Sequence, residues 1–313
     1  MRWLLYTILC FLADTLDTLV FAFVVDSQPT ISFEPSEVDD LNNQEILKRL
    51  DMAKLIPSGH SVLKLSPSTI AKFSQDVAKY NQLSDASEAN ALQLVFTKTT
   101  IPVPRLRRVV NCKWIIEDYI QGCTLAEAWP NYSIWRKLCV AFTLRRYVRQ
   151  LRRLKASPST PPGPISVEGS RICESPVFGT IRNCRGPFAS YADLADFFSE
   201  RAEIAFRYAK LPENHPQRSR HFDDSEALVF THQDINPRNI IVGEDGRLWM
   251  IDWGLSGFYP PWFEYVAMMR QSDLEKHLGS YCRYWDFLIP FICGPYFEQD
   301  SWLDDIAWGF YVG

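Results

Sequence analysis

The sequence is short of the features that mark several large classes of protein. Its 33 Lys and Arg against 37 Asp and Glu give a formal charge of −4, which argues against a nucleic-acid scaffold. Its eight cysteines form no CxxC pair and no Cys/His cluster with zinc-ligand spacing, so we interpret them as reduced thiols, with disulfides as the alternative if the chain is secreted. Its five histidines are also few for a metal-dependent hydrolase.

A long uninterrupted apolar run is missing as well. Thirteen Leu, Ile, Phe and Val residues between positions 3 and 25 favour membrane insertion by about 4 to 8 kcal/mol, whereas Asp14 and Asp17 oppose it by about 5 to 7 kcal/mol. Residues 1–25 therefore form an apolar segment with three interpretations: an anchor, a signal peptide without a clear cleavage site, or a helix packed on the fold, unless the start codon is placed too early. We expect a cytoplasmic protein, or a membrane-anchored or secreted one if this segment acts as anchor or signal.

The remaining 288 positions have an ordinary globular composition, and a chain of 313 residues favours two lobes over one core. Residues 26–54 read as an acidic linker and a helix, NNQEILKRL. Residues 55–121 predict a small sheet with one helix, because the β-type runs SVLKL and TIAKF flank a turn and two further apolar runs follow the helix. Residues 122–313 are mainly helical in pattern, with a strong helix over 191–209. The predicted fold class is therefore α+β.

The most informative stretch is 231–254, THQDINPRNIIVGEDGRLWMIDWG, which reads as a β-hairpin with acids and amides at its open end. With 243–246 as the turn, Asn239 lies opposite Met250. Asp252 is then the diagonal neighbour of Asn239 on the same face, within about 7–8 Å.

A carboxylate and an amide oxygen in this position suit a magnesium ion, which takes few protein ligands and completes its shell with water and phosphate oxygens. Asp234 lies in the loop before the hairpin, two residues after His232. A loop aspartate beside a metal–phosphate site can accept a proton from an incoming hydroxyl.

The spacing HxDxxxxN, followed by IDW, resembles the active-site signature of the aminoglycoside phosphotransferase family, which shares the protein-kinase-like fold. More narrowly, residues 55–270 resemble the fungal phosphotransferase-domain proteins through an ordered set of stretches: IPVPR, EDYIQGCTLAEAW, GPF, THQDINPRNIIV and GFYPPWFEY. The resemblance implies a small antiparallel-sheet N-lobe and a mainly helical C-lobe.

The resemblance also implies roles for the hairpin residues. Asp234 matches the catalytic aspartate, which orients and deprotonates the acceptor hydroxyl. Asn239 and Asp252 match the magnesium ligands. His232 matches the loop histidine, whose more common role is a hydrogen-bonded structural one.

In the N-lobe, Lys72 matches the strand lysine that pairs with ATP phosphates, and Glu88 matches the helix glutamate that orients this lysine. Lys64, in the first strand of the same hairpin, is the competing candidate. Other positions are implied to meet the nucleotide through their backbone: Ser58 and Gly59 over the phosphates, and Asp118 and Ile120 at the hinge.

Two residues depart from the family pattern. Gln233 stands where glycine is common, which either crowds the catalytic loop or marks the fungal subgroup. Asn236 stands where many relatives have histidine.

The resemblance implies transfer of the γ-phosphoryl group of ATP, with Mg²⁺, to a hydroxyl of a small molecule. The alternatives are a catalytically degenerate nucleotide-binding protein of the same fold and a membrane-associated interaction protein that uses residues 3–25. No nucleic-acid partner is expected, and neither the acceptor nor the oligomeric state can be deduced from the sequence.

Overall fold

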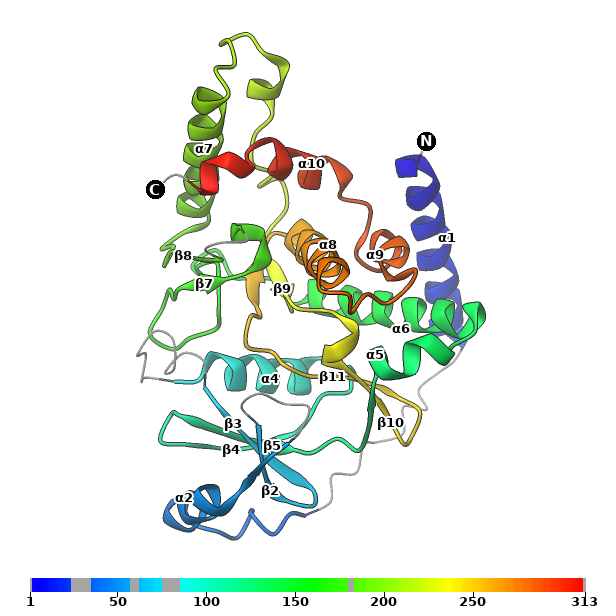
Figure 1. Ribbon diagram of the computed structural model, residues 1–313, viewed down its shortest axis with the longest axis vertical. Helices are drawn as coiled ribbons and strands as arrows, with labels where there is room; N and C mark the ends of the chain where they lie inside the picture. Colours follow the sequence, from blue (N-terminus) through cyan, green and yellow to red (C-terminus); the bar gives the residue numbers. More distant parts are fainter. Residues whose placement is uncertain (1, 24–34, 57–61, 75–84, 180–182, 312–313) are drawn as a thin grey trace.

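The computed structural model describes residues 2–23, 35–56, 62–74, 85–179 and 183–311, and these fold into two lobes (Figure 1). The smaller lobe contains a five-stranded antiparallel sheet with strand order β1-β2-β3-β5-β4. The larger lobe is mainly helical. The predicted two-lobed α+β architecture is thus confirmed. The exact domain boundaries given above remain predictions.

The sheet lobe consists of α2 (Asn43–Met52), β1 (Lys54–Leu55), β2 (Val62–Ser66), β3 (Thr69–Phe73), α4 (Ser87–Lys98), β4 (Leu106–Val110) and β5 (Trp114–Asp118). The two faces of the sheet pack against different helices. Ile46 of α2 is buried with Ala71 and Ile116 on the outer face. Ile115, on the other face, is buried with Ala89 of α4, which lies on the side of the helical lobe.

The helices of the larger lobe are α5 (Leu125–Ala128), α6 (Ile134–Arg153), α7 (Tyr191–Tyr208), α8 (Pro261–His277), α9 (Trp285–Cys293) and α10 (Phe297–Asp305). Its short 3₁₀ helices are η1 (Trp129–Asn131), η2 (Pro176–Phe178), η3 (Pro216–Ser219), η4 (Pro237–Asn239) and η5 (Ala307–Phe310). Its strands are β6 (Gly122–Thr124), β7 (Cys173–Glu174), β8 (Cys184–Arg185), β9 (Val229–Thr231), β10 (Ile240–Gly243), β11 (Leu248–Met250) and β12 (Gly257–Tyr259).

Aromatic side chains form much of the core of this lobe. Phe198 of α7 packs within 5.8 Å of Phe178 and Phe263, measured between ring centroids, and Phe222 stacks on it at 4.9 Å. Helix α6 buries Val140, Leu144, Val148 and Leu151, which recur at helix spacing along one face. A rigid, densely packed lobe of this kind can hold loops in fixed positions.

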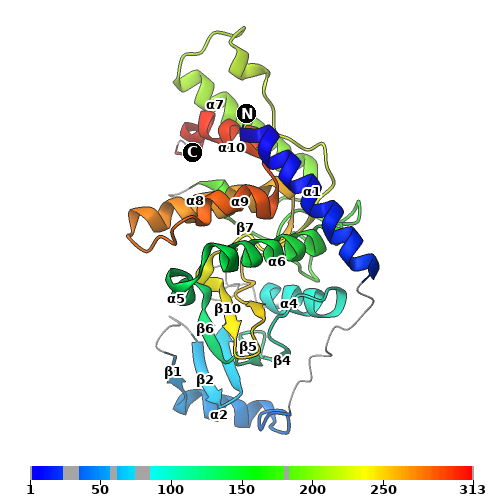
Figure 2. The ribbon, with the colours of Figure 1, turned by 90° about the vertical axis from the view of Figure 1, so that its right-hand side faces the viewer.

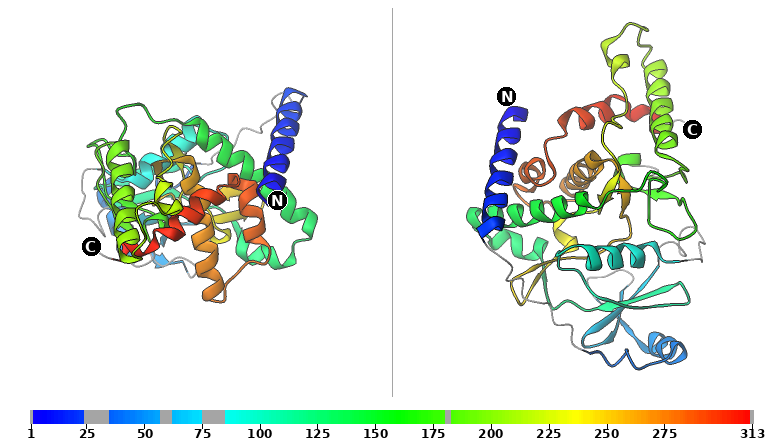
Figure 3. Two further views of the ribbon diagram at one scale, coloured as in Figure 1. Left: turned by 90° about the horizontal axis from the view of Figure 1, so that it is seen from above. Right: turned by 180° about the vertical axis from the view of Figure 1, so that it is seen from behind.

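The N-terminal residues form helix α1 (Arg2–Phe23), which packs on the helical lobe (Figure 2). The Tyr6 hydroxyl donates to the carbonyl of Phe287 in α9 at 2.8 Å, and Arg145 of α6 donates to the Asp14 carboxylate. Helix α7 stands on the opposite side of the lobe from α1 (Figure 3). Across the described ranges, no helix combines the length and the apolar character that a membrane span requires.

The β10–β11 hairpin forms as predicted, but the predicted register is wrong by one residue. Met250 lies opposite Ile240, not Asn239. The reason is the turn: the Gly246 N–H donates to the Gly243 carbonyl, and Gly246 has a φ of +76°. Such a turn followed by a left-handed glycine adds one residue to the loop as a bulge, which shifts the partner strand.

Candidate active site

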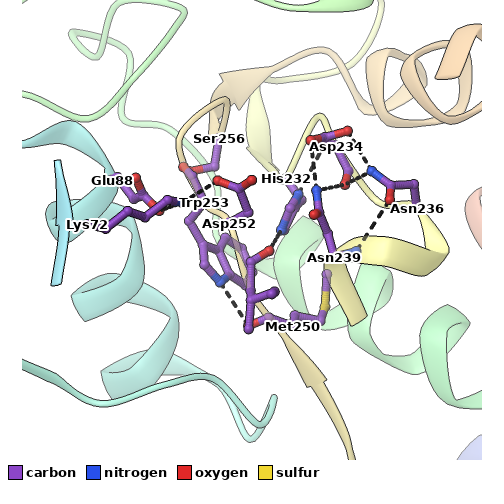
Figure 4. Close-up of polar contacts among 11 residues, drawn as sticks. Lys72, Glu88, His232, Asp234, Asn236, Asn239, Met250, Asp252, Trp253 and Ser256 are labelled. Atoms are coloured by element: carbon purple, nitrogen blue, oxygen red, sulfur yellow. Dashed lines mark hydrogen bonds and ion pairs between the residues drawn. The ribbon is translucent and has the colours of Figure 1, made fainter. Parts of the chain in front are cut away.

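The side chain of Lys72 connects the two lobes (Figure 4). Lys72 lies opposite Ile115 in the sheet, so its side chain is on the face that α4 and the helical lobe cover. Its ammonium lies 2.5 Å from a carboxylate oxygen of Glu88 in α4 and forms a second ion pair with Asp252. Burial alone would lower the pKa of Lys72, but the charges of Glu88 and Asp252 raise it above its usual value, so the lysine carries a positive charge.

Asp252 reaches Lys72 through an unusual backbone conformation rather than through regular strand alternation. It has a φ of +65°, a left-handed conformation that costs a non-glycine residue on the order of 1 kcal/mol. The residues around it fix this turn, because the Trp253 indole donates to the Met250 carbonyl at 3.2 Å and the Ser256 hydroxyl to the Trp253 carbonyl at 2.5 Å. The carboxylate is therefore aimed at the interlobe space, where 36% of its side chain stays exposed.

Asp234 lies in the loop between β9 and η4, where two side-chain amides hold its carboxylate. Asn236 donates to one oxygen at 2.8 Å and Asn239 to the other at 2.7 Å. Burial and the negative charge of Asp252 raise the pKa of Asp234 to about 7, although both amide donors oppose the shift. The Asp234 carboxylate is thus held in one orientation, and its pKa lies near neutral pH.

The sequence does not predict that Asn236 positions this loop. Its amide oxygen accepts the N–H groups of Arg238 at 2.9 Å and Asn239 at 3.3 Å, while its NH₂ group donates to Asp234. Asn236 thereby caps η4 and fixes the aspartate at the same time. An asparagine directly before a proline is a common helix-start signal, and that pattern could have identified it.

His232 is fully buried and uses both ring nitrogens inside the fold. Its Nε2 lies 3.1 Å from the Ile251 carbonyl, and its Nδ1 accepts the N–H of Asp234 at 3.2 Å. Its ring lies 4.4 Å from that of Trp253. Burial lowers the pKa of His232 to about 4, so the ring is neutral at pH 7. These contacts favour the structural role over direct participation in chemistry.

Gln233 does not crowd the loop. It has a φ of +66°, the conformation in which glycine is common, and its side chain is fully buried. The side-chain oxygen accepts the Ser175 hydroxyl at 2.6 Å, and the amide donates to the Thr231 hydroxyl at 3.0 Å. These two hydrogen bonds offset the backbone strain of a non-glycine residue at this position.

Glu264 of α8 is a site residue that the sequence does not reveal. Its two carboxylate oxygens accept the backbone N–H groups of His232 at 2.6 Å and Gln233 at 2.9 Å, and its side chain is buried. Burial raises the pKa of Glu264 to about 7 in spite of these donors. The contact joins residues more than thirty positions apart, which no local pattern indicates.

The residues expected at the hinge lie at the end of β5 and beyond it. The Asp118 side chain pairs with Arg107, on the sheet face opposite to that of Lys72. The Asp118 side chain therefore does not face the space between the lobes, and the contact expected between the nucleotide and the backbone of Asp118 and Ile120 stays a prediction. Glu117, by contrast, shares the face of Lys72 and is 94% buried, and the sequence does not single it out. Burial and the nearby Glu88 charge raise the pKa of Glu117.

The two residues predicted to cover the phosphates, Ser58 and Gly59, lie outside the described residues. All eight cysteines are free thiols, and no cluster of three His, Cys, Asp or Glu side chains suitable for a metal occurs in the described ranges.

The pair Asn239 and Asp252 nevertheless fits a magnesium ion. The Asn239 amide uses its NH₂ group on Asp234, and among the described residues its oxygen accepts no hydrogen bond. The Asp252 carboxylate is partly exposed. Two hard oxygen ligands beside open space match an ion that keeps most of its shell as water and phosphate oxygen.

Residues 143–289 match the model of the phosphotransferase enzyme family. No curated protein sequence matches the chain. Among solved structures, APH(2'')-IIa in a ternary complex with streptomycin and ATP gives a TM-score of 0.47 at 13% identity, covering 87% of this chain and 89% of that chain. The aminoglycoside phosphotransferase APH(4)-Ia gives 0.44 at 12%, covering 86% and 94%, and ADP-bound APH(2'')-Ib gives 0.44 at 13%, covering 87% and 97%.

At these TM-scores, the solved structures do not indicate what this chain binds. The family match covers Asp234, the β10–β11 hairpin and Glu264. The fungal subgroup stays a prediction. The predicted resemblance to the phosphotransferase enzyme family is confirmed over residues 143–289.

Proposed function

We propose that this protein is a phosphotransferase that uses ATP and Mg²⁺ to phosphorylate a hydroxyl of a small molecule. The observation that carries the proposal is the meeting of Lys72 and Asp252, 180 residues apart in sequence, beside the amide-held carboxylate of Asp234. The match of residues 143–289 to the phosphotransferase enzyme family supports it.

The roles follow from what phosphoryl transfer requires, which is positioning and neutralisation of charge more than covalent chemistry. Lys72, held in place by Glu88, presents a buried positive charge for phosphate oxygens. Asp234 is held by two amides with its carboxylate oriented, and its pKa of about 7 suits a group that takes a proton from a hydroxyl near neutral pH.

Asn239 and Asp252 would hold the magnesium ion, which supplies positive charge to the phosphates when bound. Asp252 forms an ion pair with the Lys72 ammonium in this structure, and the same carboxylate could instead bind the magnesium ion. Glu264 anchors the loop that carries Asp234, because its carboxylate accepts the backbone N–H groups of His232 and Gln233.

The test is ADP release from ATP and Mg²⁺ in the presence of a panel of sugars, amino sugars and polyols. Asp234→Asn is expected to keep nucleotide binding and to lose about 100-fold or more of the turnover, because the proton acceptor is gone. Asp245→Asn is the matched control, since Asp245 lies in the turn at the other end of the same hairpin. Equal turnover in the wild type and Asp234→Asn would exclude the proposed role of Asp234.

A further inference from the structure

Helix α1 leaves one side apolar and uncovered. Its inner side contacts the helical lobe, where Cys10 and Ala13 are buried. The other side consists of large apolar side chains that are 41–70% exposed: Leu4, Leu5, Ile8, Leu9, Phe11 and Leu12. Six such side chains on less than four turns of helix are more than a soluble surface usually presents together.

Helix α6 continues this surface. The Phe142 ring, 44% exposed, packs against Phe291 of α9 at 4.9 Å. The Phe291 carbonyl accepts a hydrogen bond from Arg145 and lies 3.9 Å from the sulfur of Cys10 in α1, so the three helices are in direct contact (Figure 2). Further exposed apolar side chains of α6 are Ile134, Trp135 and Leu138. We refer to the exposed apolar side chains of α1 and α6 as the α1–α6 face.

Helix α6, which contributes part of this face, is basic, whereas the whole chain is acidic. Between residues 134 and 153, α6 carries seven basic residues and no acidic one, although the chain has a formal charge of −4. Asp14 of α1 is neutralised by Arg145 at 2.8 Å and Arg149 at 3.2 Å. Arg146 is exposed one helical turn from Phe142, Arg136 is exposed near the start of α6, and α6 itself contributes no acidic side chain.

An apolar face next to basic side chains suits an anionic lipid surface better than a second copy of the chain. In a two-fold interface with a second copy of the chain, the same surface meets itself, which would bring the basic residues of α6 close to their own equivalents. An anionic lipid surface offers the opposite arrangement, because apolar side chains enter the headgroup boundary while arginines meet phosphates and a tryptophan lies at the interface.

We propose that the α1–α6 face binds an anionic lipid surface, with α1 lying in the plane of the membrane. The active site lies between the lobes, and α1 contacts α9 and α6 on the helical lobe. The lipid-binding proposal therefore does not rest on the proposed phosphoryl transfer.

The experiment is co-sedimentation of the full chain with vesicles of phosphatidylcholine alone or mixed with phosphatidylserine, at low and high salt. The wild type is expected to sediment with the mixed vesicles and to be released by salt. Ile8→Ser combined with Phe11→Ser should weaken binding about tenfold or more, since two large apolar groups are lost from the interface. Val167→Ser combined with Leu278→Ser is the matched control, because both residues are exposed and outside the face.

A charge variant completes the design. Arg136→Glu combined with Arg146→Glu should abolish the preference for phosphatidylserine, whereas Lys48→Glu combined with Lys113→Glu, at exposed positions of the sheet lobe, should not. Circular dichroism and light scattering establish that each variant is folded and report its oligomeric state. A folded wild type that does not sediment with the mixed vesicles overturns the proposal. So does a wild-type dimer that Ile8→Ser with Phe11→Ser converts to a monomer, since the face would then be an interface between copies.

Discussion

Replacing Glu264 by glutamine tests whether a buried carboxylate anchors the catalytic loop. The carboxylate accepts two backbone N–H groups, from His232 and Gln233, and its side chain is almost fully buried. Glutamine keeps one acceptor oxygen and turns an NH₂ group toward the second N–H. A buried N–H without a partner costs about 1–3 kcal/mol, so Glu264→Gln should be less stable than the wild type by that amount near pH 5.

The size of this difference should depend on pH, with a sign that the pKa of Glu264 determines. Burial raises this pKa from 4.5 to about 7 in the folded protein. Between these values the folded state binds more protons than the unfolded state, so wild-type stability falls as pH rises and then levels off. This pKa shift lowers the free energy of unfolding of the wild type by about 3 kcal/mol as pH rises through the range. Glu264→Gln has no group that titrates there, so it does not lose this stability. The variant should therefore approach or exceed the wild type in stability near pH 8.

Urea unfolding of both proteins near pH 5 and near pH 8 measures this change, because all other titrating groups are common to the pair and cancel. Glu168→Gln, at an exposed loop position, is the control and should show no such pH-dependent difference. A stability difference between wild type and Glu264→Gln that is the same at both pH values would refute the reasoning. ATP affinity should be unchanged in Glu264→Gln, because Lys72 and Asp252 are intact.

Two further substitutions test other parts of the site. Lys72→Met should lower the free energy of unfolding by about 3 kcal/mol and weaken ATP binding, because it leaves Glu88 and Asp252 without their shared cation. Lys64→Met should do neither, and equal effects of the two substitutions in unfolding and binding assays would contradict the assignment of Lys72. Gln233→Gly relieves the positive φ but removes two buried side-chain hydrogen bonds, so it should lower stability by about 1 kcal/mol net; a higher melting temperature in Gln233→Gly would show that strain outweighs those bonds.

The sequence predicts the architecture well where local patterns decide it. The turn between SVLKL and TIAKF, and the apolar periodicity of 191–209, correspond to β2, β3 and α7. The first of the two apolar runs after the helix, IPVPRLRRVV, forms a strand only from Leu106 on, because Pro102 and Pro104 cannot donate to a sheet. The hairpin register is misjudged because a single left-handed glycine, Gly246, decides it, and no periodicity reports that conformation.

The site itself is only partly predictable, for a related reason. The spacing of His232, Asp234, Asn239 and Asp252 is local, so a motif captures it. The contacts of Glu264 with the catalytic loop, and the position of Glu117 on the Lys72 face, arise from packing between distant segments. Asp252 reaches Lys72 only through its left-handed backbone, which the prediction of alternating strand faces does not include.

The most direct test of the central claim is a calorimetric titration of the full chain with ATP, with and without Mg²⁺, beside Asp252→Ala. A site in which Asp252 and Asn239 hold magnesium predicts ATP binding that requires Mg²⁺ and is lost in Asp252→Ala. Equal ATP affinity in the folded wild type and Asp252→Ala, or no binding by either, would contradict the account.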